Sequence, residues 1–260
     1  MALNNMKTAT ITFHAPNNNG SFLQAYALQK YITTHFDNVE NEIIDFQPES
    51  QQQQYAIFRK IHSKKDILRN LISFWHYKAL SKRFLAFSEM REKYLKMTKR
   101  CTTTEEAIKI AGNYDLVIAG SDQIWNTTAR DFSEAFFLPG ISKKSTYAVS
   151  CGSHLNEVDC DRICSAMETF ENVSVREIDT REFLEKHTKR SIETVLDPAF
   201  LLTKEDYSGL YDKERILKEK YIFLYTINYD EDALKQTVRV AERLGGCKIA
   251  VSYTHLRAHE

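Results

Sequence analysis

An uninterrupted apolar run that ends in a cluster of polar residues limits the choice of fold for this chain. The run, Leu116 to Ala119, lies within YDLVIAGSDQIWN (residues 114–126) and is typical of a strand covered on both faces of a parallel sheet. Open α/β sheets bind ligands at the carboxyl ends of such strands. The candidate site residues that follow the run are Ser121, Asp122, Gln123, Trp125 and Asn126. A second interpretation is a structural turn, in which Ser121 or Asp122 caps a short helix and Trp125 fills the core.

Strand-like and helix-like segments alternate along the rest of the chain. Helical patterns at 161–170, 180–188 and 232–245 separate apolar, β-branched segments that read as strands. The expected strands cover residues 8–13, 41–46, 115–119, 144–150, 172–177, 193–197, 221–227 and 247–250. This alternation predicts an α/β fold with a doubly wound parallel sheet and ligands at its carboxyl edge.

The first strand leads through the loop HAPNNNGS (residues 14–21) into a helix, FLQAYALQKYI. Ser21 is the expected N-cap of this helix. The amino end of a helix favours an anion, because its N–H groups are unpaired and its dipole is positive there. The loop has neither a GxGxxG pattern nor a P-loop lysine, so it gives little support for nucleotide binding.

Charge and cysteine content exclude several classes of protein. The 260 residues contain 35 Lys and Arg and 35 Asp and Glu, so the balance argues against nucleic acid as a partner. The five cysteines lack metal-ligand spacing, and we expect reduced core thiols and no metal. The sequence has no signal-peptide pattern and no apolar run long enough to span a bilayer, so we expect a cytoplasmic protein.

Residues 55–97 differ in character, since Lys and Arg alternate there with aromatic and aliphatic residues. We expect two or three amphipathic helices that form an insertion at about 50–100. The favoured interpretation places their apolar face on the core and their basic face in solvent. The alternative is weak, peripheral association with an anionic membrane or a polyanionic glycan.

The predicted domains follow from these patterns. Residues 1–202 form an N-terminal domain, 203–218 a linker, and 219–250 the start of a second domain that is cut off. The last ten residues, VSYTHLRAHE (251–260), can be encoded by a transposon-based sequencing adapter read in frame. We therefore expect this tail, with His255 and His259, to be foreign to the protein; an ordinary amphipathic terminus is the alternative.

Five strand-end segments in order resemble the polysaccharide pyruvyl transferase family. They are ITFHAPNNNGSFLQAYAL, YDLVIAGSDQIWN, YAVSCGS, SVRE and VLDPAFLL, and the resemblance covers about 8–202 and resumes at 221. The family commonly has Asn-Tyr-Gly-Ala where this chain has Asn18, Asn19, Gly20 and Ser21. The missing tyrosine affects the expected acceptor contacts.

The resemblance implies two facing Rossmann-like domains in a GT-B-like arrangement, the second truncated here. It implies transfer of a pyruvyl group from phosphoenolpyruvate, the co-substrate, onto two sugar hydroxyls as a cyclic ketal, with no further cofactor. The acceptor would be a sugar or lipid-linked oligosaccharide of exopolysaccharide or cell-surface glycan biosynthesis.

The resemblance also implies roles for particular residues. Arg176, in SVRE, corresponds to a donor-binding arginine, although a salt bridge with Glu177 is an equal alternative. His14 is the candidate catalytic histidine, and a histidine bonded to backbone carbonyls is the alternative. The acceptor-binding candidates are Asn18, Gly20, Gln24, Ser121, Asp122, Gln123, Trp125 and Asn126. A further donor arginine and histidine of the family lie in a C-terminal motif beyond Ala250, so we expect this chain alone to be catalytically incomplete.

Two rival functions remain open at this point. A GT-B glycosyltransferase that uses a nucleotide-sugar shares the architecture and would release a nucleoside diphosphate instead of phosphate. A non-catalytic glycan-binding or assembly protein would keep the acceptor domain alone.

Overall fold

The computed structural model describes residues 5–152, 157–211, 217–226 and 230–253. The chain forms two compact units, residues 1–203 and 204–260, which are taken one at a time below. Within the described residues, no helix is both long enough and apolar enough to cross a membrane.

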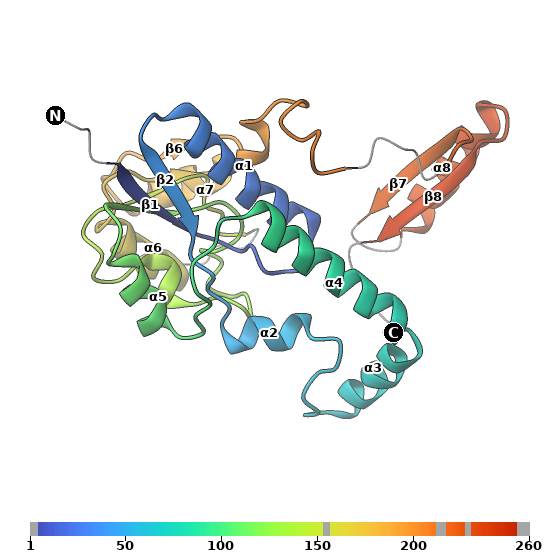
Figure 1. Ribbon diagram of the computed structural model, residues 1–260, viewed down its shortest axis with the longest axis horizontal. Coiled ribbons are helices and arrows are strands. Elements are labelled where there is room, and N and C mark those ends of the chain that lie inside the picture. Colours follow the sequence, from blue (N-terminus) through green and yellow to red (C-terminus); the bar gives the residue numbers. More distant parts are fainter. Residues whose placement is uncertain (1–4, 153–156, 212–216, 227–229, 254–260) are drawn as a thin grey trace. The chain divides into compact units, whose positions relative to one another are not determined.

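The first unit is built on a parallel sheet, which confirms the predicted fold class. Its strands have the order β2-β1-β3-β4 and are all parallel. Figure 1 shows β1 and β2 side by side. Val149 bridges both Asp122 and Val175, so the pairing continues from the end of β3 toward a second parallel pair, β5 and β6. The strands are β1 (Met6–Ile11), β2 (Val39–Ile43), β3 (Leu116–Ala119), β4 (Lys144–Thr146), β5 (Ser174–Val175) and β6 (Glu193–Thr194).

Two local expectations for this unit are wrong. The strand expected over 144–150 is interrupted because Ala148 adopts a positive φ of 51°. The first helix begins earlier than expected, with Asn18 as its N-cap accepting a hydrogen bond from Gly20 N, so Ser21 lies inside the helix. The helices around the sheet are α1 (Asn19–His35), α5 (Thr104–Ala111), α6 (Glu157–Met167) and α7 (Ile178–Leu184), with 3-10 turns η1 (Glu134–Phe137) and η2 (Pro198–Phe200).

The core of this unit forms around β1 and β3. Ala9, Ile11 and Val117 are fully buried at the centre of the sheet, and a cluster of aromatic rings packs beside them. The chain between β3 and η1 contributes two of the largest buried residues, Ile124 and Trp125. The polar segment after β3 is therefore anchored by its own apolar residues.

Three helices occupy the predicted insertion: α2 (Glu49–Tyr55), α3 (Lys64–Trp75) and α4 (Tyr77–Tyr94). The second half of α4 packs on the body through Phe87, as expected, and also through Arg91, a basic residue that was expected in solvent. The apolar side of α3 does not, since Ser73 is its one buried residue and Trp75 is 83% exposed. The expectation that the apolar face of this insertion covers the core is thus wrong for α3.

The second unit is a single β-α-β motif. β7 and β8 pair in parallel from Tyr221↔Lys248 to Thr226↔Tyr253, and α8 connects them. Residues 251–253 of the expected foreign tail continue β8, and their origin stays a prediction. The elements are β7 (Tyr221–Thr226), α8 (Glu231–Arg243) and β8 (Lys248–Tyr253).

Candidate functional site

The candidate site lies where the direction of sheet building reverses. The chain moves from β1 outward to β2, then crosses back to β3 on the other side of β1. Ligands of open α/β sheets bind in the crevice at the carboxyl ends of the two strands that flank such a reversal. Here these ends deliver Thr12 to His14 after β1 and Gly120 to Asp122 after β3.

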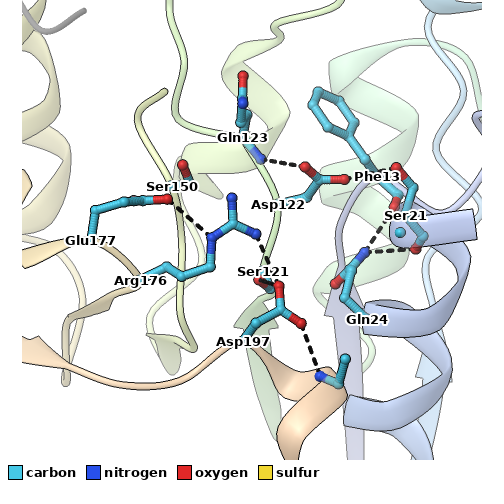
Figure 2. A network of polar contacts seen from close by, with 12 residues as sticks. Phe13, Ser21, Gln24, Ser121, Asp122, Gln123, Ser150, Arg176, Glu177 and Asp197 are labelled. Atoms are coloured by element: carbon cyan, nitrogen blue, oxygen red, sulfur yellow. Dashed lines mark hydrogen bonds and ion pairs between the residues drawn. The ribbon is translucent and has the colours of Figure 1, made fainter. Parts of the chain in front are cut away.

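The amino end of α1 is fixed against the end of β3. Ser21 Oγ donates to Asp122 Oδ2 at 2.8 Å, over a sequence separation of 101 residues. Gln24 is buried, and its Nε2 donates to the backbone oxygens of Phe13 and Ser21 (Figure 2). Gln24 therefore holds the loop before α1 in place, and its amide is occupied by the protein itself.

Asp122 is the most unusual residue of the site. Its backbone has φ of 77°, a left-handed conformation that non-glycine residues rarely adopt and that clusters at functional sites. Burial raises the pKa of its carboxyl group above the ordinary value, while hydrogen bonds from Gln123 N and Ser21 and the charge of Arg176 act in the opposite direction. A carboxyl group whose pKa is raised in this way is a candidate for proton transfer.

Arg176 follows β5 and lies between two carboxylates. Its Nε contacts Glu177 Oε1 at 3.0 Å, and its Nη1 contacts Asp197 Oδ2 at 2.9 Å (Figure 2). Asp197 also accepts from Ser121 Oγ at 3.3 Å and, through Oδ1, from Ala199 N at the start of η2. The salt bridge foreseen with Glu177 is present, and Asp197 is a second partner that sequence reasoning missed.

The loop after β4 packs tightly against the turn after β3. Gly152 has φ of +76°, and a Cβ atom built there would lie 2.6 Å from Asn126 Nδ2. Asn126 is fixed by Gln123 Oε1, which accepts from its Nδ2, and by Thr128 Oγ1, which donates to its Oδ1. Only glycine fits at position 152 without moving the Asn126 amide.

Four of the expected site residues are buried, namely His14, Gln24, Ser121 and Trp125. Trp125 is 0% exposed, its Nε1 donates to Phe136 O, and its ring packs edge-on against Phe137 and Phe170. Trp125 is therefore not placed to bind an acceptor as expected, because its ring is inside the core. The alternative, a tryptophan that fills the core beneath a turn, describes what the structure contains.

His14 is also 0% exposed. Its Nε2 lies 2.9 Å from Asp45 Oδ1, and its Nδ1 lies 3.2 Å from Thr12 O. Both ring nitrogens are thus occupied by protein oxygens, and the imidazole is not placed to touch an acceptor. The expectation of a catalytic histidine at this position gives way to its structural alternative.

Two further ionisable residues, Asp131 and Tyr55, lie near Asp122, and neither was predicted from the sequence as a site residue. Asp131 is buried, and burial together with the charge of Asp122 raises its pKa. Burial and these two aspartates raise the pKa of Tyr55, at the end of α2, to about 12. The buried Gln51 amide lies close enough to lower the pKa of Asp131, yet its two polar atoms have no hydrogen-bond partner among the described residues.

A pattern in the sequence could have predicted two of the carboxylates that were not named from it as site residues. Asp45 and Asp197 come directly after short apolar segments, at the same carboxyl edge of the sheet as Asp122. Asp131 and Tyr55 carry no such signal, because a loop and an inserted helix bring them to the site. In the described part of the chain, no group of three or more His, Cys, Asp or Glu residues has the arrangement of a metal site.

Comparison with known proteins identifies the family. The family model described as Polysaccharide pyruvyl transferase matches residues 18–253, which include Ser21, Asp122 and Arg176. Searches of curated proteins and of solved structures each found no match. The matched range covers most of both units, and the chain belongs to the polysaccharide pyruvyl transferase family.

Proposed function

We propose that this chain is part of a pyruvyl transferase that uses phosphoenolpyruvate to place a cyclic ketal on two hydroxyl groups of a sugar. Family membership implies a transferase that acts on polysaccharide. The finer proposal places the enzyme in the cytoplasm, in exopolysaccharide or cell-surface glycan synthesis, with a sugar or lipid-linked oligosaccharide as acceptor and no other cofactor. The observation that carries it is the guanidinium of Arg176 at the carboxyl edge of the sheet, near Asp122.

Arg176 is the proposed donor-binding residue. Phosphoenolpyruvate carries a carboxylate and a phosphate, both of which a guanidinium binds in a planar, two-point geometry. Glu177 and Asp197 each contact one nitrogen of Arg176, so the guanidinium keeps N–H groups for a ligand. The same carboxylates hold the guanidinium in one orientation before the donor arrives.

The local charge favours additional cations in the complete donor site. Arg176 is flanked by two carboxylates, and an anionic donor in this place would be repelled by them. The amino end of α1 supplies a partial positive charge, which is smaller than one full unit. The arginine and histidine that the family resemblance implies in a C-terminal motif would supply the rest, and their need stays a prediction.

Asp122 is the proposed proton-transfer group and acceptor ligand. The protonated Asp122 carboxyl group gives its proton to the donor methylene carbon, which makes the neighbouring carbon electrophilic. A sugar hydroxyl then forms the first C–O bond and returns a proton to the Asp122 carboxylate. The second hydroxyl forms the second C–O bond as the C–O bond to phosphate breaks. Its proton leaves with phosphate, so one proton ends on the new methyl group and the other on the leaving group. Gln123 and Asn126 would hydrogen-bond the acceptor beside Asp122, and Asn18 and Gly20 would line it from the start of α1.

The experiment compares donors with the complete gene product. Phosphate release from phosphoenolpyruvate that depends on an added oligosaccharide, together with a ketal methyl signal in the product, is the expected result. Release of a nucleoside diphosphate from a nucleotide-sugar would instead make the protein a glycosyltransferase. Glycan binding with neither reaction would make it a binding protein.

Arg176→Lys tests the donor assignment within that experiment. Lysine keeps the positive charge but cannot form the two parallel hydrogen bonds of a guanidinium. We therefore expect kcat/KM for phosphoenolpyruvate to fall by about 10- to 100-fold, equivalent to about 1.5–3 kcal/mol. Arg190→Lys is the matched control, because the Arg190 guanidinium donates to the backbone oxygens of Glu168, Phe170 and Glu171 and should not affect donor use. Unchanged donor kinetics in Arg176→Lys would make Arg176 a structural ion-pair residue.

A further inference from the structure

Amphipathic helices usually place their apolar face on the protein core, and α3 has the opposite orientation. Asp66, Arg69, Asn70 and Ser73 share one face, and they are its less exposed residues. Asn70 exchanges hydrogen bonds with the backbone of Arg59, at 2.9 Å for each. The polar face of α3 therefore contacts the chain, and its apolar face points outward.

The outward side is the α3 apolar face, made of Ile67, Leu68, Leu71, Ile72, Phe74 and Trp75. These six side chains are between 41% and 83% exposed, and their spacing brings them together on one side of the helix. The helix lies at the outer end of α4, away from the sheet (Figure 1). Soluble monomeric proteins rarely expose contiguous apolar surface of this kind unless it binds something.

Basic residues are concentrated in the segment that contains the α3 apolar face. Residues 59–83 contain eight Lys or Arg and a single acidic residue, Asp66, whereas the complete chain is neutral. Lys64 lies at the amino end of α3, and Lys78 and Lys82 lie on the adjoining turns of α4. Charge is thus concentrated in the same place as exposed apolar surface.

We propose that the α3 apolar face docks on an anionic phospholipid bilayer, with α3 lying flat in the interface. Interfacial helices bury Trp, Phe and Leu at the level of the headgroups while flanking Lys and Arg contact anionic lipids. A second copy of the chain is a poorer occupant, since two surfaces of the same strong positive charge would repel each other. Nucleic acid would match the charge and leave the apolar side chains unused.

The hairpin of α3 and α4 is connected to the candidate site through the loop before α1. Arg83 Nη2 donates to Asn17 O at 2.8 Å, and Arg91 Nη1 donates to Ala15 O at 2.9 Å. Docking would therefore hold an element that is bonded directly to the site loop. The proposal itself rests on the surface of α3 and is independent of the donor and acceptor chemistry.

Tryptophan fluorescence offers a direct test because the chain has two tryptophans in opposite environments. Trp125 is fully buried and should not respond to lipid, whereas Trp75 lies at the end of the α3 apolar face. The 260-residue chain is mixed with vesicles of phosphatidylcholine alone or with added phosphatidylglycerol. We expect a shift of emission to shorter wavelength and flotation with the vesicles only when phosphatidylglycerol is present, and no shift for Trp75→Phe.

Two pairs of test and control variants distinguish docking through α3 from non-specific adsorption to vesicles. Lys64→Gln with Lys78→Gln should weaken partitioning roughly 30-fold, since each basic residue near an anionic surface contributes a factor of about 5. Lys109→Gln with Lys143→Gln removes the same charge elsewhere and should change it by no more than about twofold. Phe74→Ser should reduce flotation, while Phe200→Ser, which removes a phenylalanine of similar exposure outside α3, should not.

Several results would overturn the proposal. Equal losses in the control and test variants would show non-specific adsorption. Self-association that is abolished by Phe74→Ser, without vesicle binding, would assign the face to a second copy. Emission from Trp75 that is already at short wavelength and shielded from acrylamide without lipid would show that the face is covered within the chain.

Discussion

The carboxyl edge of the sheet and the α3 apolar face depart from the burial rule in opposite directions. At the edge, charged and polar groups such as Asp122 and Arg176 are partly or largely buried, and Ser21 and Asp197 respectively are bonded to them. On α3, large apolar side chains are left in solvent while Asn70 and Ser73 face the protein. Neither arrangement helps the chain to fold, because burying charge and exposing apolar surface both reduce stability.

The difference shows what each region is organised for. The edge is rigid and closely packed, with side chains held by several partners, as expected where the geometry of a reaction matters. The α3 apolar face has few internal contacts, as expected of a surface that is completed by something else. Places where a sequence departs from consistency with its fold are expected to be functional.

The two tryptophans give the largest expected contrast between the regions. Trp125→Ala removes a fully buried ring that packs on Phe137 and Phe170, and we expect unfolding free energy to fall by about 3–5 kcal/mol. Trp75→Ala removes a ring that is 83% exposed, and we expect a change within about 0.5 kcal/mol. Urea unfolding followed by far-ultraviolet circular dichroism measures both. A large loss in Trp75→Ala would mean that the α3 apolar face is covered within the protein.

Two glycines test how closely the edge is packed. Gly140 and Gly152 both have φ of +76°, but a Cβ atom meets nothing within 4 Å at Gly140 and lies 2.6 Å from Asn126 Nδ2 at Gly152. Gly140→Ala should therefore cost about 1–2 kcal/mol from backbone strain alone. Gly152→Ala should cost about 1–3 kcal/mol more, because the Asn126 amide must move. Equal midpoints in urea would show that the edge has room to adjust.

The sequence predicted the fold because the periodic patterns that define it are local. The run from Leu116 to Ala119 and the alternating β1 each identify a strand without knowledge of partners. Boundaries were less accurate where one residue changes the path of the backbone. Ala148 interrupts the strand after Thr146 by adopting a positive φ, and an alanine side chain does not predict this conformation.

The site was predicted in position and only partly in its members. That the ends of β1 and β3 meet follows from parallel topology, and the Ser21–Asp122 hydrogen bond joins the segments that follow these two strands. The burial of Trp125 and His14 depends on how the loops at the edge of the sheet pack. That packing is set by contacts between residues far apart in sequence. The outward orientation of α3 was also out of reach, since an amphipathic pattern defines two faces and does not say which one meets the protein.

Asp45 and Glu49 allow the effect on stability of a buried charge at the edge to be compared with that of a surface charge in the insertion. Burial alone raises the pKa of Asp45, but hydrogen bonds and charges from His14, Gln47 and Arg100 lower it overall from 3.8 to about 2. A lowered pKa stabilises the fold above the unfolded value, and this stabilisation of about 2 kcal/mol is lost as pH falls from about 5 to 2. Asp45→Asn should therefore be less stable at pH 7 and should lose this part of the acid sensitivity. Glu49→Gln, which removes an exposed ion pair with Lys60, should leave unfolding curves unchanged at every pH above 5.

Asp122→Asn should have a smaller effect on stability than Asp45→Asn, and its sign should be opposite. Because burial raises the pKa of Asp122, its contribution to folding is complete below the unfolded pKa and is lost as pH rises through the folded pKa. Asparagine carries no charge to bury and tolerates a positive φ of 77° better than most residues. The variant should therefore match the wild type near pH 3 and become the more stable protein as pH rises to 7, as measured by urea midpoints across that range. A variant that is less stable at pH 7 would mean that Asp122 is an ordinary paired carboxylate and not a carboxyl group prepared for proton transfer.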